Sequence, residues 1–215
     1  MNLILVPKTN FDQLWAGEYL SDVLRPSDHI LLFHFSENHE YDLISFDYEE
    51  DIIRPFLTYG IAKERIKIIT PYVDDEENIQ YTLEQDYDVI GFVGNDAYQA
   101  MLYLDDYGIK EKIQSFEGTL LFVGEIGYVA GDVVQDEIEG LGLLDELQMD
   151  INYRYDEDHI ARVIRLLEMG HSKVVLIPEE GGLLSINHYY DTFGRATVVG
   201  EDDLDSLYET FHNSL

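Results

Sequence analysis

Residues 88–96 read DVIGFVGND, and this stretch decides the fold class. Within it, residues 89–93 form a nearly continuous apolar run, which is typical of a strand covered on both faces, as in a parallel sheet. Gly94 and Asn95 interrupt the run, and a helical pattern follows over residues 96–107. The stretch therefore predicts a strand, a turn and a helix, which is the repeating unit of an α/β fold.

The same alternation of short apolar runs and helical patterns extends outward from this stretch. Strands are expected at residues 3–6, 29–35, 66–70, 89–93 and 120–123. Helices are expected at residues 12–24, 48–59, 75–85 and 96–107. Pro55 falls inside the second helix and predicts a kink there. Alternation of this kind predicts right-handed crossovers and a doubly wound, mostly parallel sheet with helices on both faces.

The pattern changes after residue 150. A helix is expected at 158–169, a strand at 174–178 and a last helix at 202–212. Two short runs at residues 182–187 and 195–199, with turn residues between them, predict a C-terminal antiparallel hairpin at the end of the sheet. The sequence has no internal repeat, low-complexity tract or linker, so a single domain over residues 1–215 is predicted.

The composition is strongly acidic, with 44 Asp and Glu residues against 13 Lys and Arg residues and a net charge of −31. This charge repels phosphate backbones and anionic lipid surfaces, so neither nucleic acid nor membrane is expected as a partner. A basic protein would be attracted instead. The acidic clusters lack the spacing of a calcium loop, and no metal or other cofactor is expected. Monomer and homodimer both remain open.

The chain has no cysteine, which excludes disulfides, thiolate metal sites and a cysteine nucleophile. The apolar run at residues 3–6 is too short for a signal peptide, and no run reaches the roughly 20 residues of a membrane span. A cytoplasmic location is therefore predicted.

Three motifs follow one another between residues 88 and 144. The first is the strand ending in Gly94-Asn95, the second is GTLLFVG at 118–124, and the third is GLGLL at 140–144. In this order they resemble the aspartyl dipeptidase (peptidase E) and cyanophycinase family of serine peptidases, a branch of the class I glutamine amidotransferase-like fold. The resemblance implies that fold along nearly the whole chain, including its final hairpin.

The family carries its nucleophile in a Gly-x-Ser-Ala-Gly turn after the second strand, and the resemblance leaves two registers for this turn. Residues 127–131 read GYVAG and place Val129 at the serine position, whereas residues 124–128 place Ile126 there. The first register is preferred because Ala130 and Gly131 are kept. In both registers a hydrocarbon replaces the hydroxyl, and a hydrocarbon cannot attack a carbonyl.

The family's histidine position is matched by Arg154, which stays protonated and makes a poor general base. Asp132 or Asp136 would be the acidic partner, but it has nothing to orient. The wider fold's glutamine amidotransfer is excluded, because that reaction needs a cysteine. The resemblance therefore implies a catalytically degenerate relative.

The expected function is binding of a small carboxylate or peptide ligand, or of a protein partner, in the crevice at the strand ends. The resemblance places Gly94, Asn95, Gly127, Val129, Ala130 and Arg154 along this crevice. The alternative is a peptidase- or amidase-like hydrolase with rebuilt chemistry, using Glu125, Asp132 or Tyr128. For Glu125 a solvent-facing position is preferred, and for Tyr128 a packing role.

The histidines give no convincing metal site. His159 and His171 are expected at opposite ends of one helix, about 18 Å apart, and so cannot share a metal. His34 and Ser36 could meet a ligand at the end of the second strand, but a structural role is preferred for the histidines around it, His29, His34 and His39.

Overall fold

The computed structural model describes residues 1–35, 52–71, 74, 76–134, 138–144 and 147–214. Its centre is a seven-stranded sheet with the order β11-β10-β1-β5-β4-β2-β3. The bounds of these strands are β1 Asn2–Val6, β2 Ile30–Phe35, β3 Ile66–Ile69, β4 Val89–Gly94, β5 Thr119–Val123, β10 Gly181–Ile186 and β11 Tyr189–Gly194. The five strands from β1 to β3 are parallel to one another, whereas β10 and β11 run antiparallel. The predicted α/β class with a mostly parallel sheet is confirmed.

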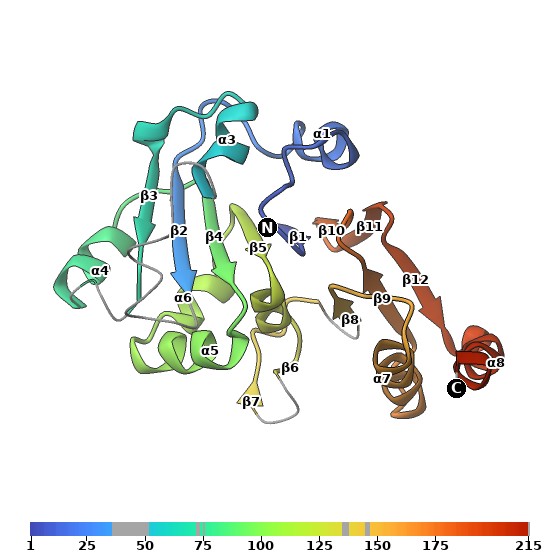
Figure 1. Ribbon diagram of the computed structural model, residues 1–215. Coiled ribbons are helices and arrows are strands. Elements are labelled where there is room, and N and C mark those ends of the chain that lie inside the picture. Colours follow the sequence, from blue (N-terminus) through green and yellow to red (C-terminus); the bar gives the residue numbers. More distant parts are fainter. Residues whose placement is uncertain (36–51, 72–73, 75, 135–137, 145–146, 215) are drawn as a thin grey trace.

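Helices cover both faces of this sheet (Figure 1). On one face lie α4 Glu76–Leu83, α5 Ala97–Asp106 and α6 Lys110–Gln114. On the other lie α1 Leu14–Leu20 and α3 Arg54–Thr58. Alternate strand residues point to opposite cores, so that Leu3 and Leu5 of β1 pack on the first side and Ile4 and Val6 on the second. Burial on both faces explains why the inner strands β1, β5, β4 and β2 are mostly apolar.

A second sheet of three strands, with the order β12-β9-β8, lies at one end of the molecule (Figure 1). Its strands are β8 Gln148–Ile151, β9 Lys173–Ile177 and β12 Thr197–Gly200. Helices α7 Glu157–Glu168 and α8 Leu204–Ser214 pack with it around a separate apolar cluster. Strands β8 and β9 also contribute Ile151 and Ile177 to the main core, so the two sheets share buried contacts.

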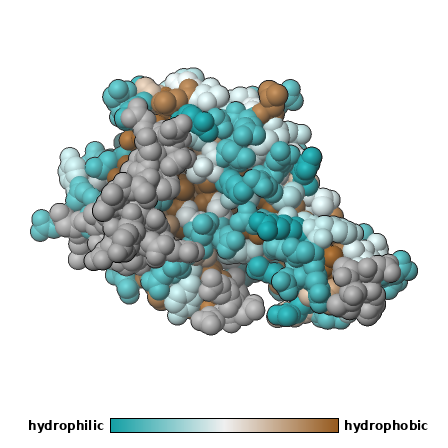
Figure 2. Space-filling view, viewed as in Figure 1, coloured by the Kyte–Doolittle hydropathy of each residue, from teal (hydrophilic) through white to brown (hydrophobic). Residues whose placement is uncertain are grey.

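Short elements complete the described chain. They are the two-stranded pair β6 Val133–Val134 and β7 Ile138–Glu139, and the 3-10 helices η2 Lys63–Arg65, η3 Glu125–Ala130 and η4 Glu201–Asp203. None of the helices in the described ranges is long and apolar enough to cross a membrane. The described surface in Figure 2 is mainly hydrophilic, with small hydrophobic patches between polar side chains.

Of the helix expected at residues 48–59, residues 48–51 lie outside the described residues, residues 52 and 53 are π-helical, and α3 begins at Arg54 with Pro55 in its first turn. One prediction about the local structure is wrong. Residues 195–199 do not pair with the strand at 182–187. That strand pairs with β11, a strand the sequence analysis did not predict, and residues 197–200 pair with β9 in the second sheet.

Candidate functional site

The turn after β5 is where the resemblance led us to expect a nucleophile turn. Gly124 adopts a φ of 95°, and a Cβ at this position would lie 2.4 Å from the carbonyl oxygen of Gly94. The side-chain oxygen of Asn95 accepts a hydrogen bond from the backbone N–H of Glu125 at 3.4 Å. Gly94 and Asn95 therefore shape the turn at the tips of β4 and β5, and only a glycine at 124 permits this approach.

The segment that follows is a buried 3-10 helix. Ile126, Val129 and Ala130 of η3 are all fully buried and belong to the main core. The carbonyl oxygens of Val129 and Ala130 accept hydrogen bonds from Leu141 and Leu143, so their backbone is also occupied. Both candidate serine positions thus lie inside the protein, and the sharp bend occurs at Gly124, at the other end of η3 from Val129.

The two candidate acidic partners of the family's triad give no site either. Asp132 is exposed, and its backbone carbonyl accepts a hydrogen bond from Gly140. Asp136 lies outside the described residues.

Tyr128 of η3 reaches strand β8 of the second sheet. Its hydroxyl accepts hydrogen bonds from the backbone N–H of Ile151 and from Nη1 of Arg162, each at 2.9 Å, and it donates to Oδ1 of Asp150 at 3.3 Å. Burial raises the pKa of this phenol far above its usual range, and Arg162 opposes the rise only in part. Tyr128 is therefore a neutral structural hydroxyl and has no nucleophilic character at neutral pH.

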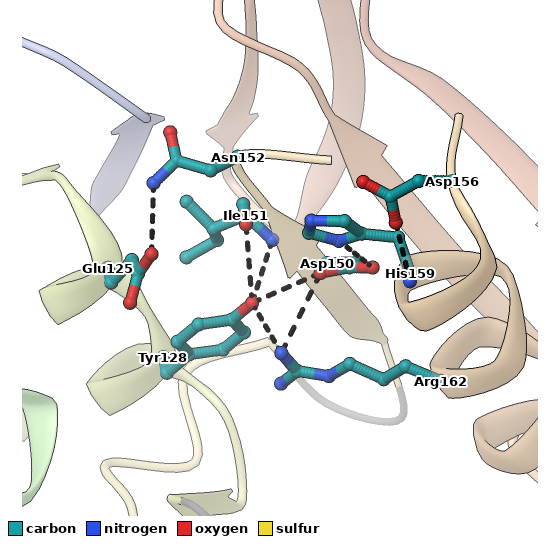
Figure 3. Close-up of polar contacts among 8 residues, drawn as sticks. All are labelled: Glu125, Tyr128, Asp150, Ile151, Asn152, Asp156, His159 and Arg162. Atoms are coloured by element: carbon teal, nitrogen blue, oxygen red, sulfur yellow. Dashed lines mark hydrogen bonds and ion pairs between the residues drawn. The ribbon is translucent and has the colours of Figure 1, made fainter. Parts of the chain in front are cut away.

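Asp150 is the centre of this network (Figure 3). Its side chain is completely buried, and Oδ2 lies 2.9 Å from Nδ1 of His159, while Oδ1 lies 3.7 Å from Nη1 of Arg162. The guanidinium of Arg162 also lies over the ring of Tyr128, 4.5 Å from its centroid. A buried carboxylate needs partners of this kind, because an isolated buried charge is strongly destabilising.

His159 and Arg162 reach Asp150 from the same face of α7, three residues apart. Asp156 caps the start of this helix by accepting from the backbone N–H of His159 at 3.1 Å. The His159 side chain is 24% exposed, and Asp150 binds only its Nδ1. The pair therefore resembles the base and orienting acid of a hydrolytic triad.

A cavity of about 300 Å³ lies beside the network, at the carboxyl ends of three strands. Its lining comes from the segments after β1, β8 and β9, together with a residue after β11. The lining residues are Lys8, Asn152, Tyr153, Arg154, Pro178, Glu179, Glu180 and Arg195. Three cations thus face two carboxylates in a protein whose overall charge is −31.

Arg154 is the unpaired cation of this cavity. Lys8 pairs with Glu179 at 2.5 Å, and the hydrogen bond and charge of Lys8 lower the pKa of that carboxyl. Arg195 pairs with Glu180 at 3.3 Å. Arg154 makes no hydrogen bond or ion pair with any residue in the described ranges, although its charge also helps to lower the pKa of the Glu179 carboxyl.

Asn152 joins the cavity wall to the polar network. It adopts a left-handed conformation with a φ of 62°, and its Nδ2 donates to Oε1 of Glu125 at 3.2 Å (Figure 3). The backbone N–H of Tyr153 donates to Ile177 at 3.0 Å. Hydrogen bonds of Asn152 and Tyr153 thus hold the segment that joins β8 to Arg154.

The structure thus separates the residues that the resemblance placed in one crevice. Arg154 lines the cavity, whereas Gly127, Val129 and Ala130 are buried residues of η3, and Gly94 and Asn95 shape the turn after β5. Glu125 is exposed and contacts Asn152.

Sequence reasoning missed Asp150 altogether and gave His159 no role. One signal was available. His159 and Arg162 fall on the same helix face, three residues apart, shortly after an acid in a short apolar run.

The remaining histidine candidates form no site in the described structure. His34 is buried within β2, and His29 lies against Arg65 and Asp88 at the surface. Ser36 and His39 lie outside the described residues. Within the described ranges, no group of three or more His, Asp or Glu side chains is placed to hold a metal ion.

No protein-family model matches the chain, and no curated protein matches it.

Proposed function

We propose that the chain is a non-catalytic relative of the aspartyl dipeptidases that binds a small carboxylate ligand in the cavity beside Arg154. The unpaired guanidinium of Arg154 is the observation that carries this proposal. Guanidinium groups pair with carboxylates through two parallel hydrogen bonds, which gives both affinity and orientation.

The position and charge of the cavity support a ligand of this kind. Open α/β sheets bind ligands outside the carboxyl ends of their strands, and the cavity lies at those ends of β1, β8 and β9. Lys8, Arg154 and Arg195 are three of the protein's 13 basic residues. A volume of about 300 Å³ suits a molecule of amino-acid size.

The absence of catalysis is supported by the burial of the two candidate serine positions. Val129 and Ile126 each have an exposed fraction of 0%, so substrate cannot reach a side chain at either position without opening the core. Arg154, at the family's histidine position, keeps its proton and acts as an anion-binding group.

The experiment is a titration with N-acetylglycine followed by two-dimensional NMR. Binding in the millimolar range is expected, with shifts confined to the segments after β1, β8 and β9. Arg154→Gln is expected to weaken binding by about tenfold to a hundredfold, because a hydrogen bond to a charged group is worth about 1.5–3 kcal/mol. Arg165→Gln, at an exposed position on α7, removes the same charge and is expected to leave binding unchanged. Equal effects of the two substitutions would contradict the proposal.

A hydrolase is the second candidate, and the Asp150–His159 pair is the observation that favours it. A carboxylate on Nδ1 orients the imidazole so that Nε2 can accept a proton from water or from a substrate hydroxyl. On this hypothesis, turnover of an amide or ester is abolished in His159→Asn and reduced in Asp150→Asn. Turnover that survives His159→Asn would exclude His159 as the base.

A further inference from the structure

A second hollow lies on the other side of Glu180 from the cavity. Its volume is about 890 Å³, and it runs along the start of α1, where Asp12, Leu14, Trp15 and Glu18 line it together with Glu180. Leu14 is 98% exposed, and a Cβ on Gly17 would meet no atom within 4 Å. The hollow is therefore open to solvent and presents an uncovered apolar side chain.

The charge of this hollow is opposite to that of its neighbour. Three carboxylates line it, those of Asp12, Glu18 and Glu180, and no lysine or arginine is among its described lining residues. Asp12 lies 3.8 Å from Arg54, and Glu180 pairs with Arg195. The carboxylate of Glu18 makes no ion pair with a residue in the described part of the chain, so it is left to attract a cation.

Glu180 lines both hollows, so the two adjoin at this residue, and an extended ligand that occupied both would cross it. On one side it would meet the Arg154 guanidinium, and on the other the carboxylate of Glu18 and the side chain of Leu14. A molecule complementary to this surface carries an anionic group at one end. Further along, it carries a cationic group next to an apolar one.

We propose that the two hollows together bind the C-terminal tail of a basic partner protein. This inference rests on the proposed function, because the terminal carboxylate of the tail takes the place of the small carboxylate at Arg154. A lysine or arginine upstream of the terminus pairs with Glu18, and an apolar neighbour packs on Leu14. The openness of the α1 hollow lets the chain continue outward to a folded domain, which a closed peptide pocket would forbid.

The probes are fluorescein-labelled hexapeptides of Gly and Ser with a free C-terminus and one Leu-Lys pair, placed two, three or four residues before the end. Matched peptides carry Glu in place of Lys, or a C-terminal amide. The best Lys peptide is expected to bind about tenfold more tightly than its Glu counterpart at low salt, and the difference shrinks as salt screens the charges. The amide is expected to bind about tenfold or more weakly than the free acid.

Any basic peptide is attracted to a protein of charge −31. The variants must therefore distinguish binding in the α1 hollow from nonspecific attraction to the net negative charge of the protein. Glu18→Gln is expected to reduce the preference for Lys over Glu by about twofold to fivefold, the strength of an exposed ion pair. Glu84→Gln removes the same charge at an exposed position just after α4 and is expected to change the preference much less. Leu14→Ser is expected to weaken every Leu-Lys peptide without affecting folding, because Leu14 is exposed.

The outcomes separate this inference from the proposed function. Equal binding of Lys and Glu peptides, or equal effects of Glu18→Gln and Glu84→Gln, would overturn the tail proposal while N-acetylglycine binding through Arg154 still stands. Equal binding of acid and amide, with no N-acetylglycine binding, would overturn both. Binding of the free peptide but not of the same sequence fused behind a folded carrier domain would exclude a protein tail.

Discussion

The hydroxyl of Tyr128 accepts a hydrogen bond from the backbone N–H of Ile151 at 2.9 Å. Ile151 ends β8, which is the outer strand of the second sheet, and its N–H points away from β9 toward η3. A side chain from the segment after β5 thus satisfies an edge donor of another sheet. This bond and the contacts of Asp150 connect η3 to the wall of the Arg154 cavity.

Tyr128→Phe is expected to lower the free energy of unfolding by about 1–3 kcal/mol, because it leaves the buried N–H of Ile151 without an acceptor. The phenylalanine ring keeps the contact with the Arg162 guanidinium, so the loss reports the hydroxyl alone. Urea unfolding measures the change. Tyr155→Phe is the matched control, since that hydroxyl contacts Thr210 at an exposed position, and a change below about 0.5 kcal/mol is expected there. Equal losses of stability in the two variants would contradict the conclusion that the Tyr128 hydroxyl is needed by the N–H of Ile151.

Gly124→Ala is expected to destabilise the protein by about 2 kcal/mol or more. An alanine at this position would be strained by the positive φ, and its Cβ would lie 2.4 Å from the carbonyl oxygen of Gly94. Gly170→Ala is the control, because Gly170 has nearly the same φ, 92°, and open space around its Cβ position. A cost of about 1–2 kcal/mol is expected for that backbone strain alone. Thermal unfolding measures both variants. A larger loss of stability in Gly170→Ala than in Gly124→Ala would refute the close approach of residue 124 to the carbonyl oxygen of Gly94.

Asn187→Val is expected to cost about 1–2 kcal/mol in the turn between β10 and β11. Asn187 and His188 both have positive φ values, 50° and 65°, and they join the paired residues Ile186 and Tyr189. This two-residue geometry favours Asn and Gly and penalises a β-branched side chain. Asn187→Gly is the control and is expected to be nearly neutral in urea unfolding. A neutral Asn187→Val would show that the left-handed conformation is not maintained in solution.

The stability of the protein is expected to fall as the pH rises from 10 to 12. Burial, and secondarily the Asp12 carboxylate, raise the pKa of Tyr59 to about 12. In the unfolded chain this phenol titrates near pH 10, so within this window the folded state holds a proton that the unfolded state has released. The stability that protonated Tyr59 contributes is fully present below pH 10 and is lost as the pH rises through 12.

Denaturant unfolding of the unaltered chain and of Tyr59→Phe, at several alkaline pH values, measures this contribution. The variant is expected to show a shallower decline, because it has no phenol at this position. Tyr189→Phe, at an 81% exposed position, is the control. Parallel declines in the unaltered chain and in Tyr59→Phe would show that Tyr59 does not carry the effect.

The parallel strands of the central sheet could be predicted because most of their residues are apolar, as burial on both faces requires for β1, β5, β4 and β2. All five expected parallel strands are present, and no bound shifts by more than one residue. The strands that were missed are of another kind. β11 reads YYDTFG and lacks an apolar run, and β8 contains a charged residue, Asp150, which obscures a strand of four residues.

The candidate site was only partly predictable for the same reason. Arg154 was identified through the resemblance, but the only sequence signal for Asp150 is its place in a short apolar run shortly before His159 and Arg162, and this does not show that the carboxylate is buried. Its burial depends on His159, Arg162 and Tyr128, which come from two other elements. Burial of a charge is a tertiary property, and local patterns do not carry it.

The place of β1 in the central sheet has a consequence for synthesis. One edge of β1 pairs with β5, but the other edge pairs with β10, about 180 residues later in the chain. A ribosome adding 5–20 residues per second needs roughly 10–40 s to deliver that partner. Throughout this interval the nascent chain presents an apolar strand with an open edge, so this is the segment on which a chaperone is expected to act.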